Sequence, residues 1–600
     1  MIRASLLVSL LLCIALNSTA QTQKKPPAIV SPLCTRTNAV ENTRQQILFS
    51  RTFDHVAGRI AVLLRSADLL WPYEQDKALA AFMEAFDLAT QNFKEQGEQV
   101  RRSSDAQFAM RMTLPDQRYK VIAALAKRDP AVARKLADQM LKDEAREAAD
   151  KPATDNKAAR STAEKLLNVA SGLAPADQNA ALNFARASLR YPATLSLASF
   201  LYNLAKVNQA RADQFYVEAL AAYAAAPMDQ LLYLSAYPFG NNRDSGEMPS
   251  YTLYRIPDGF VPNAEFQRKF VQTLLARAQS ESEAPVQHVS RGLSDLGQMW
   301  VAFSRLEKQI QTNLPDLFDS AVQTRDKLYA LLNPSMQTVA TEAIARDNPP
   351  KRSFDEQVEA ALKLANVDQR DQGLTFAVLN GSRDETAERV VGVIDKISDA
   401  TVRSELANWF FFYRAQSLID EKKLDEARTS ASKVSELDQR AYLFARIAEK
   451  SLDESEDQTQ AREMLNEIAD AAAKAPKTIV SARTLLALAH LYAKIDVNRG
   501  IQELGNAVKT INAIESPDFT NQMVMVKIEG KTFGAFGSYS TPGFNPENAF
   551  REMGRIDFDG TLAHATSFAD KPLRGLTTLA VIEPCLEVAP AKAAPRKSKP

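Results

Sequence analysis

The stretch KISDATVR, residues 396–403, belongs to a short motif that recurs along the chain. It aligns without gaps with three other segments, KLANVDQR (363–370), KVSELDQR (433–440) and SFADKPLR (567–574). Each copy has an apolar second residue, a small third, an acidic or amide fourth and arginine in the eighth place. The first three arginines lie 33 and 37 residues apart, the length of one helix-turn-helix unit. The motif therefore predicts an array of helical repeats.

The composition around the motif favours the same fold. Glycine is scarce, at 20 of 600 residues, and apolar residues return every three or four positions over long stretches. Segments such as RIAVLLRSADLLW (59–71) and SARTLLALAHLYAKI (481–495) place these apolar residues on one helix face. Short turns containing Asp-Pro or Ala-Pro suit antiparallel helix pairs. We predict an all-α solenoid or superhelix of antiparallel helix pairs, interrupted by two irregular, aromatic-rich insertions.

Parts of the chain resemble the tetratricopeptide repeat family. The second helix of that family carries Ala, Phe and Ala at fixed spacing and then a proline, an order matched by Ala180, Phe184, Ala187 and Pro192. Ala78, Phe82 and Ala85 match it without the proline, while the tryptophan and glycine of the family's first helix are missing. The resemblance covers about half of the chain and implies architecture rather than activity.

The acidic residue of the motif lies four positions before the arginine in three copies. On a helix surface this spacing predicts an ion pair in each copy. The predicted pairs are Asp399 with Arg403, Glu436 with Arg440, and Asp570 with Arg574. In the last copy Pro572 also allows a turn instead.

The first twenty residues are typical of a secretory signal peptide. Arg3 precedes an apolar run over residues 6–16, and Ser18 and Ala20 supply the small residues before a cleavage site after Ala20. No later run of about 18 apolar residues follows, so we expect a periplasmic or secreted protein without a transmembrane segment in the mature chain. The 73 basic and 73 acidic side chains balance, and nothing points to nucleic acid as a partner.

Changes in composition divide the chain further. Gly, Pro and aromatic residues concentrate in 235–263 and in 525–547, where a small hairpin is expected around Glu529-Gly530, and a linker is expected around 346–353. The expected segments are a signal peptide (1–20), a flexible N-terminal segment (21–45), an N-terminal helical array (46–345) with the insertion 235–263, tetratricopeptide-like repeats (354–515), an insertion and terminal helical repeat (516–586), and a disordered tail (587–600).

Removing the signal peptide leaves two cysteines, Cys34 and Cys585. Two cysteines in an oxidising compartment favour a disulfide bond, which would require the two ends of the chain to meet. Two unrelated thiols are the alternative, because sequence alone does not show whether the residues are close.

Residues 557–562, DFDGTL, resemble the nucleophile motif of haloacid dehalogenase-type phosphatases. That family needs a whole α/β domain after the motif, whereas the chain ends at residue 600 and the motif leads into the fourth repeat copy. We therefore assign it to the helical array. The four histidines, His55, His288, His490 and His564, lie far apart, so no zinc site and no cofactor are predicted.

The aromatic residues of the two insertions are the candidate binding residues, because loops and aromatic side chains dominate interaction surfaces. They are Tyr237, Phe239, Tyr251, Tyr254 and Phe260 in the first insertion, with Phe533, Phe536, Tyr539 and Phe544 in the second. The alternative is that they fold back and fill gaps in the superhelix.

Two functions remain open at this point. The first is a non-enzymatic envelope or secreted scaffold that binds a protein or peptide partner along its concave face. The second is an enzyme of the helical-superhelix or α/α-toroid kind that acts on cell-wall or other glycan, which needs two carboxylates at roughly 5 to 9.5 Å from each other.

Overall fold

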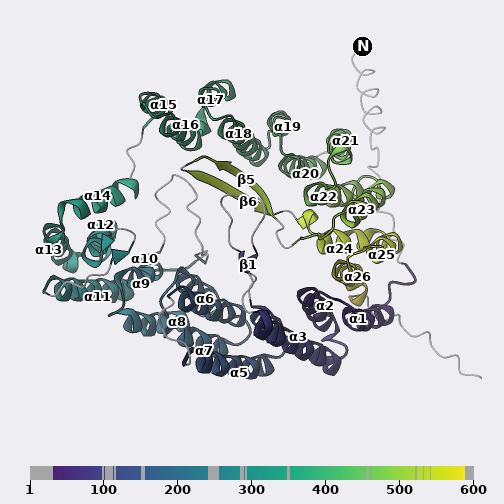
Figure 1. Ribbon diagram of the computed structural model, residues 1–600, viewed down its shortest axis with the longest axis horizontal. Coiled ribbons are helices and arrows are strands. Elements are labelled where there is room, and N and C mark those ends of the chain that lie inside the picture. Colours follow the sequence, from purple (N-terminus) through teal and green to yellow (C-terminus); the bar gives the residue numbers. More distant parts are fainter. Residues whose placement is uncertain are drawn as a thin grey trace, which may run out of the picture.

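The computed structural model describes residues 31–96, 100–101, 112–113, 116–149, 156–240, 256–257, 259–283, 289–290, 293–347, 352–454, 458–519, 523–531, 533–540 and 542–587. Pairs of antiparallel helices follow one another around a ring (Figure 1). The all-α solenoid of helix pairs predicted from the sequence is confirmed. The expected signal peptide (1–20) and most of the expected tail (588–600) lie outside the described residues.

The first half of the chain contains the elements up to α14. They are α1 (Arg36–Ser50), α2 (Val56–Leu70), α3 (Gln75–Gln96), β1 (Val100–Arg101), β2 (Met112–Thr113), α4 (Gln117–Ala126), α5 (Pro130–Ala149), α6 (Asn156–Leu173), α7 (Gln178–Ser188), α8 (Leu195–Tyr223), α9 (Met228–Leu232), η1 (Tyr233–Ser235), α10 (Ala236–Phe239), α11 (Ala264–Glu283), β3 (Val289–Ser290), β4 (Leu293–Ser294), α12 (Asp295–Asn313), α13 (Pro315–Leu331) and α14 (Pro334–Asp347).

The second half contains the remaining helices and one longer hairpin. They are α15 (Phe354–Leu362), α16 (Val367–Gly381), η2 (Ser382–Asp384), α17 (Ala387–Ile394), α18 (Ala400–Asp420), α19 (Leu424–Ala431), α20 (Leu437–Glu454), α21 (Thr459–Lys474), α22 (Ile479–Ala493), α23 (Val497–Asn512), β5 (Met523–Glu529), β6 (Gly534–Ser540), η3 (Pro542–Phe544), α24 (Pro546–Ile556), α25 (Phe558–Thr566) and α26 (Lys571–Leu586).

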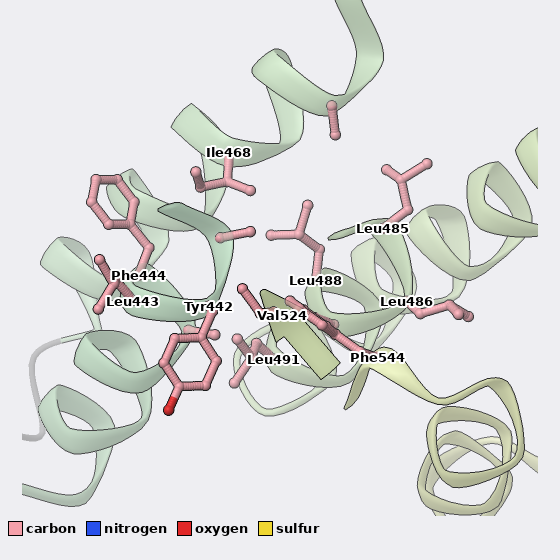
Figure 2. Packing of buried hydrophobic residues seen from close by; sticks show 14 of the residues in the cluster. Tyr442, Leu443, Phe444, Ile468, Leu485, Leu486, Leu488, Leu491, Val524 and Phe544 are labelled. Carbon is pink, nitrogen blue, oxygen red and sulfur yellow. The ribbon is translucent and has the colours of Figure 1, made fainter. Parts of the chain in front are cut away.

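Successive helix pairs share tightly packed cores. In the second half, α16, α18, α20, α22, α24 and α26 follow one another along the inner side of the ring. Figure 2 shows how Phe444 of α20, Ile468 of α21 and Leu488 of α22 pack together. The space left between them is about 10 Å³, roughly what one water molecule needs. The apolar stripes seen in the sequence therefore meet as a close-packed core.

The two ends of the described part of the chain meet where α26 packs against α1 and α2, a contact that we call the closure interface. Val62 and Leu69 of α2 belong to the same hydrophobic cluster as Val581 of α26. Cys34 and Cys585 form a disulfide bond there, with their Cα atoms 5.1 Å apart. The array is thus continuous from the C-terminal helices into the N-terminal ones.

At the closure interface, the N-terminal segment is more ordered than the sequence predicted. Residues 36–45 were expected to be flexible, but they form most of α1. Thr35 caps this helix by accepting a hydrogen bond from the N–H of Asn38, and α26 supplies the packing partner. Local composition did not show this because the partner lies at the other end of the sequence.

On the opposite side of the ring the array has two ends. Helix α14 packs against α12, and α15 packs against α16, while residues 348–351 between α14 and α15 lie outside the described chain. The outer faces of both end helices are polar, with Ser335, Thr338 and Thr341 exposed on α14 and Asp355, Glu356 and Glu359 exposed on α15. Such polar faces are typical of the capping helices that end a solenoid.

The repeated motif forms the corner at which an inner helix begins. In three copies the fourth residue is the N-cap of the helix, because Asn366, Asp399 and Asp570 each accept a hydrogen bond from first-turn N–H groups of α16, α18 and α26. In the other copy, α20 begins directly after the fourth residue, Glu436. An N-cap side chain of this kind satisfies donors that the helix itself leaves unpaired. The motif therefore marks helix starts.

The arginine of the motif has a different partner from the predicted one. Arg403 donates to the carbonyl oxygen of Ile397 at 2.8 Å, and Arg574 donates to that of Phe568 at 2.8 Å. Arg440 makes the equivalent bond to Val434 at 3.4 Å. The predicted ion pairs with the fourth residue are wrong, because in each of these three copies the arginine bonds the carbonyl oxygen of the motif's second residue. In addition, Asp399 and Asp570 are turned toward the N–H groups of their own helices.

The corners at which α18 and α20 begin are also held by the preceding inner helix. Asp371 of α16 accepts from the N–H groups of Ser398 and Asp399, and Asn408 of α18 accepts from that of Ser435 at 2.8 Å. In both cases the acceptor lies 27 residues before the first N–H group that it binds. Buried polar side chains thus fix the angle between successive repeats.

We expect Arg403→Leu to lower the free energy of unfolding by about 1–2 kcal/mol, because a charged donor to the Ile397 carbonyl is lost. Asp399→Asn should cost only a few tenths of a kcal/mol, since asparagine is an equally good N-cap. Urea denaturation of both variants checks the assignment. An Asp399–Arg403 ion pair would instead be supported if both variants lost the same free energy of unfolding and the double variant lost less than the sum of the two.

Candidate functional site on the inner face of the ring

A β-hairpin lies on the inner side of the ring. Strands β5 and β6 pair antiparallel, with Val526 opposite Gly537, and the hairpin expected around Glu529-Gly530 is present. Figure 1 shows it next to α18 and α20, against which β5 packs. Side chains alternate along β5, so that Val524, Val526 and Ile528 are buried against the helices.

Three neighbouring inner helices hold this hairpin through polar contacts. The Glu405 carboxylate of α18 accepts from the N–H of Glu529 at 2.6 Å, and the Gln439 amide of α20 donates to the carbonyl oxygen of Met525 at 2.7 Å. Near the turn, Lys531 forms an ion pair of 2.9 Å with Asp368 of α16. Two of the three contacts are with the main chain of β5.

Strand β6 approaches α18 very closely. The Tyr539 ring lies 5.0 Å from that of Phe412 and 5.6 Å from that of Tyr442, measured between ring centroids. A Cβ atom on Gly537 would lie only 2.6 Å from the hydroxyl oxygen of Tyr413. A side chain at position 537 would therefore require β6 or the Tyr413 side chain to shift.

The electrostatics under the hairpin reflect partial burial. Burial raises the pKa of the Glu405 carboxyl, while the bond from the Glu529 N–H and the charge of Lys527 act in the opposite direction. Asp438, in the first turn of α20, also has a raised pKa, chiefly because it is buried. Among the described residues, no group of three or more His, Cys, Asp or Glu side chains is arranged to hold a metal ion.

The aromatic residues singled out from the sequence occupy different environments. Tyr237, Phe239, Phe533 and Phe544 are buried, and Phe260 and Tyr539 are partly buried against the cores. Phe536 is 43 % exposed. Tyr251 and Tyr254 lie outside the described residues. Most of the described candidates therefore contribute to packing, and Phe536 is the one that presents a large surface.

Sequence reasoning missed the residues that hold and extend this surface. Met523 is 44 % exposed and Lys527 is exposed, both on the face of β5 opposite the helices. The alternation in MVMVKIE (523–529) is a strand signal that would have placed them together. Glu405 and Gln439 have no such signal, because their contacts depend on tertiary packing.

The phosphatase-like motif has a structural role. Asp557 is the N-cap of α25 and accepts from the N–H of Gly560 at 3.1 Å. Asp559 accepts from the hydroxyl of Ser31 at 2.8 Å. Both carboxylates of DFDGTL thus have structural hydrogen-bond partners, and the second lies close to the closure interface.

A cluster of charged residues lies at the closure interface. Glu583 of α26 binds both Arg65 of α2 and Arg551 of α24. Glu547 of α24 is partly buried beside them, and burial raises the pKa of its carboxyl. Arg65, Arg551 and Lys120 act to lower this pKa, and Glu583 acts to raise it.

This raised pKa gives a pH-dependent stability. The folded protein binds a proton at Glu547 more tightly than the unfolded chain does, so the ionised carboxylate lowers stability at neutral pH. That cost disappears as the pH falls through the folded pKa toward the ordinary value of about 4.3. We therefore expect Glu547→Gln to raise the urea midpoint at pH 7, with a gain that shrinks toward pH 4. A gain that is independent of pH would contradict this assignment.

None of the described helices is long and apolar enough to cross a membrane. No family model and no curated protein matches the sequence. Among solved structures, the chain matches a circular tandem repeat protein with novel repeat topology and enhanced subunit contact surfaces, at 13 % identity over 90 % of this chain and 96 % of that one. The TM-score is 0.18, so this likeness carries no argument about the site.

Proposed function

We propose that the protein is an exported, non-enzymatic scaffold that binds a protein or peptide partner on the inner side of its ring. Support for export comes from the N-terminal sequence, with its apolar run over residues 6–16. Support for binding comes from the exposed face of the hairpin, which packs on the helical array.

The observation that carries the proposal is the composition of that face. Met523 and Phe536 are 44 % and 43 % exposed, and Lys527 lies directly opposite Phe536 in the strand register. Exposed methionine and phenylalanine supply adaptable apolar contact area, which is typical of protein-binding surfaces. The lysine adds a charge at the edge of this area.

Site-specific photo-cross-linking tests the proposal. A photoreactive phenylalanine analogue placed at position 536 of the mature chain should capture a discrete polypeptide in an envelope extract of the source cells. The same analogue at Leu331, which is 48 % exposed on α13, serves as the control. Capture at position 536 should be lost when Met523 and Lys527 are changed to serine. Equal capture at both positions, or none at position 536, would reject the proposal.

A further inference from the structure

We infer that the inner face of α16, α18 and α20 is a groove for an extended polypeptide strand, and that the β5–β6 hairpin occupies this groove in cis. The inference goes beyond the proposed function, because it concerns the surface beneath the hairpin and names the class of segment that fits there. The hairpin is then an internal competitor for that segment.

The first support is the nature of the polar contacts. Glu405 binds a main-chain N–H and Gln439 binds a main-chain carbonyl oxygen, on residues 529 and 525 of one strand. Main-chain contacts do not depend on the side chains of the bound strand. Another extended segment could therefore make the same hydrogen bonds, as in other cases of strand recognition.

The second support is the spacing of the buried side chains. Val524, Val526 and Ile528 are 0 %, 0 % and 1 % exposed, while the residues between them are not buried. Figure 2 shows Val524 beside Tyr442 of α20 and Leu491 of α22. The surface therefore accepts apolar side chains at every second position. The fitting ligand is an extended segment with three alternating β-branched or other apolar residues.

The third support is the position of the hairpin in the sequence. The helices that hold β5 are separated from it by 86 and 124 residues at these two hydrogen bonds, so the strand lies on a surface built by an earlier part of the chain. A peptide strand that displaced β5 would therefore make the same contacts with these helices. A tethered competitor acts at an effective concentration on the order of millimolar, so the intact chain should bind such a strand weakly.

The test uses a labelled peptide of residues 523–531, MVMVKIEGK, as the probe. It is titrated against the mature chain and against a variant whose residues 523–540 are replaced by a flexible Gly/Ser linker. We expect the variant to bind the peptide at least about 100-fold more tightly than the intact chain does. A peptide with serine in place of Val524, Val526 and Ile528 is the matched control and should bind at least about tenfold more weakly.

Substitutions in the groove distinguish specific from non-specific peptide binding. In the linker variant, Glu405→Leu combined with Gln439→Leu should weaken peptide binding by at least about tenfold, because both main-chain partners are lost. A folded linker variant that does not bind the peptide, or that binds both peptides equally, would overturn the inference. Helical circular dichroism and a cooperative urea transition establish that this variant is folded.

If the linker variant does not fold, the same peptide is titrated against a single-residue variant of the intact chain. The Gly537→Val side chain collides with the Tyr413 hydroxyl, which should weaken the packing of β6 on α18 and raise the affinity for the peptide by at least about tenfold. Unchanged affinity in this variant overturns the inference. Cross-linking at position 536 does not depend on strand exchange, so the proposed function can stand when this inference fails.

Discussion

Replacing Cys34 and Cys585 by alanine is expected to lower the free energy of unfolding by up to about 6 kcal/mol. The disulfide spans 551 residues of sequence, and chain entropy makes the effect of a cross-link grow with the length of the loop that it closes. Without the bond, the unfolded chain gains freedom while the folded closure interface keeps its apolar contacts. Urea denaturation of the oxidised wild type and of the double variant measures the difference.

Reduction provides the control for this experiment. Dithiothreitol should shift the urea midpoint of the wild type down to that of the double variant, and should leave the double variant unchanged. A wild type whose midpoint does not respond to reduction would show that contacts of α26 with α1 and α2 alone determine the stability of the closure.

The second large effect is expected in the core of the C-terminal repeats. Phe444 is fully buried between α20, α21 and α22 (Figure 2), and Phe444→Ala should cost about 3–5 kcal/mol because it removes apolar contact and leaves a cavity. Phe536→Ala is the matched control, since the same truncation at a site 43 % exposed should cost less than about 0.5 kcal/mol.

Urea or thermal unfolding followed by circular dichroism compares the two variants. Because each repeat is stabilised by its neighbours, the loss at Phe444 in α20 should spread to α21 and α22 and broaden or split the transition. Equal stabilities of the two variants would mean that the apolar stripe of α20 contributes little to the packing.

The repeat architecture followed from local sequence, whereas the partners of the repeated residues did not. The motif predicted helix pairs because apolar spacing and helix starts depend on neighbours in the sequence. The spacing of Asp399 and Arg403 also fitted an ion pair on a helix surface. That interpretation failed because the acidic residue precedes the helix as its N-cap, a position that changes where its side chain points.

The candidate site was predictable in part. The glycine- and aromatic-rich composition of 525–547 indicated a hairpin, but not that its apolar residues would be buried on the repeats. Aromatic content alone did not separate Phe536, which is exposed, from Phe544, which is buried. That distinction depends on α18, α20 and α22, which come earlier in the sequence and share no local pattern with the hairpin.

The closure interface has a consequence for the order of folding. Helices α1 and α2 are made early in synthesis, yet α26, against which they pack, is the last of the described helices. Their residues Ala39, Val62 and Leu69 cannot be covered by the C-terminal core until nearly the whole chain exists. Contacts so distant in sequence form slowly, and uncovered apolar surface promotes aggregation in the meantime. The N-terminal helices therefore keep apolar surface uncovered until α26 has been made.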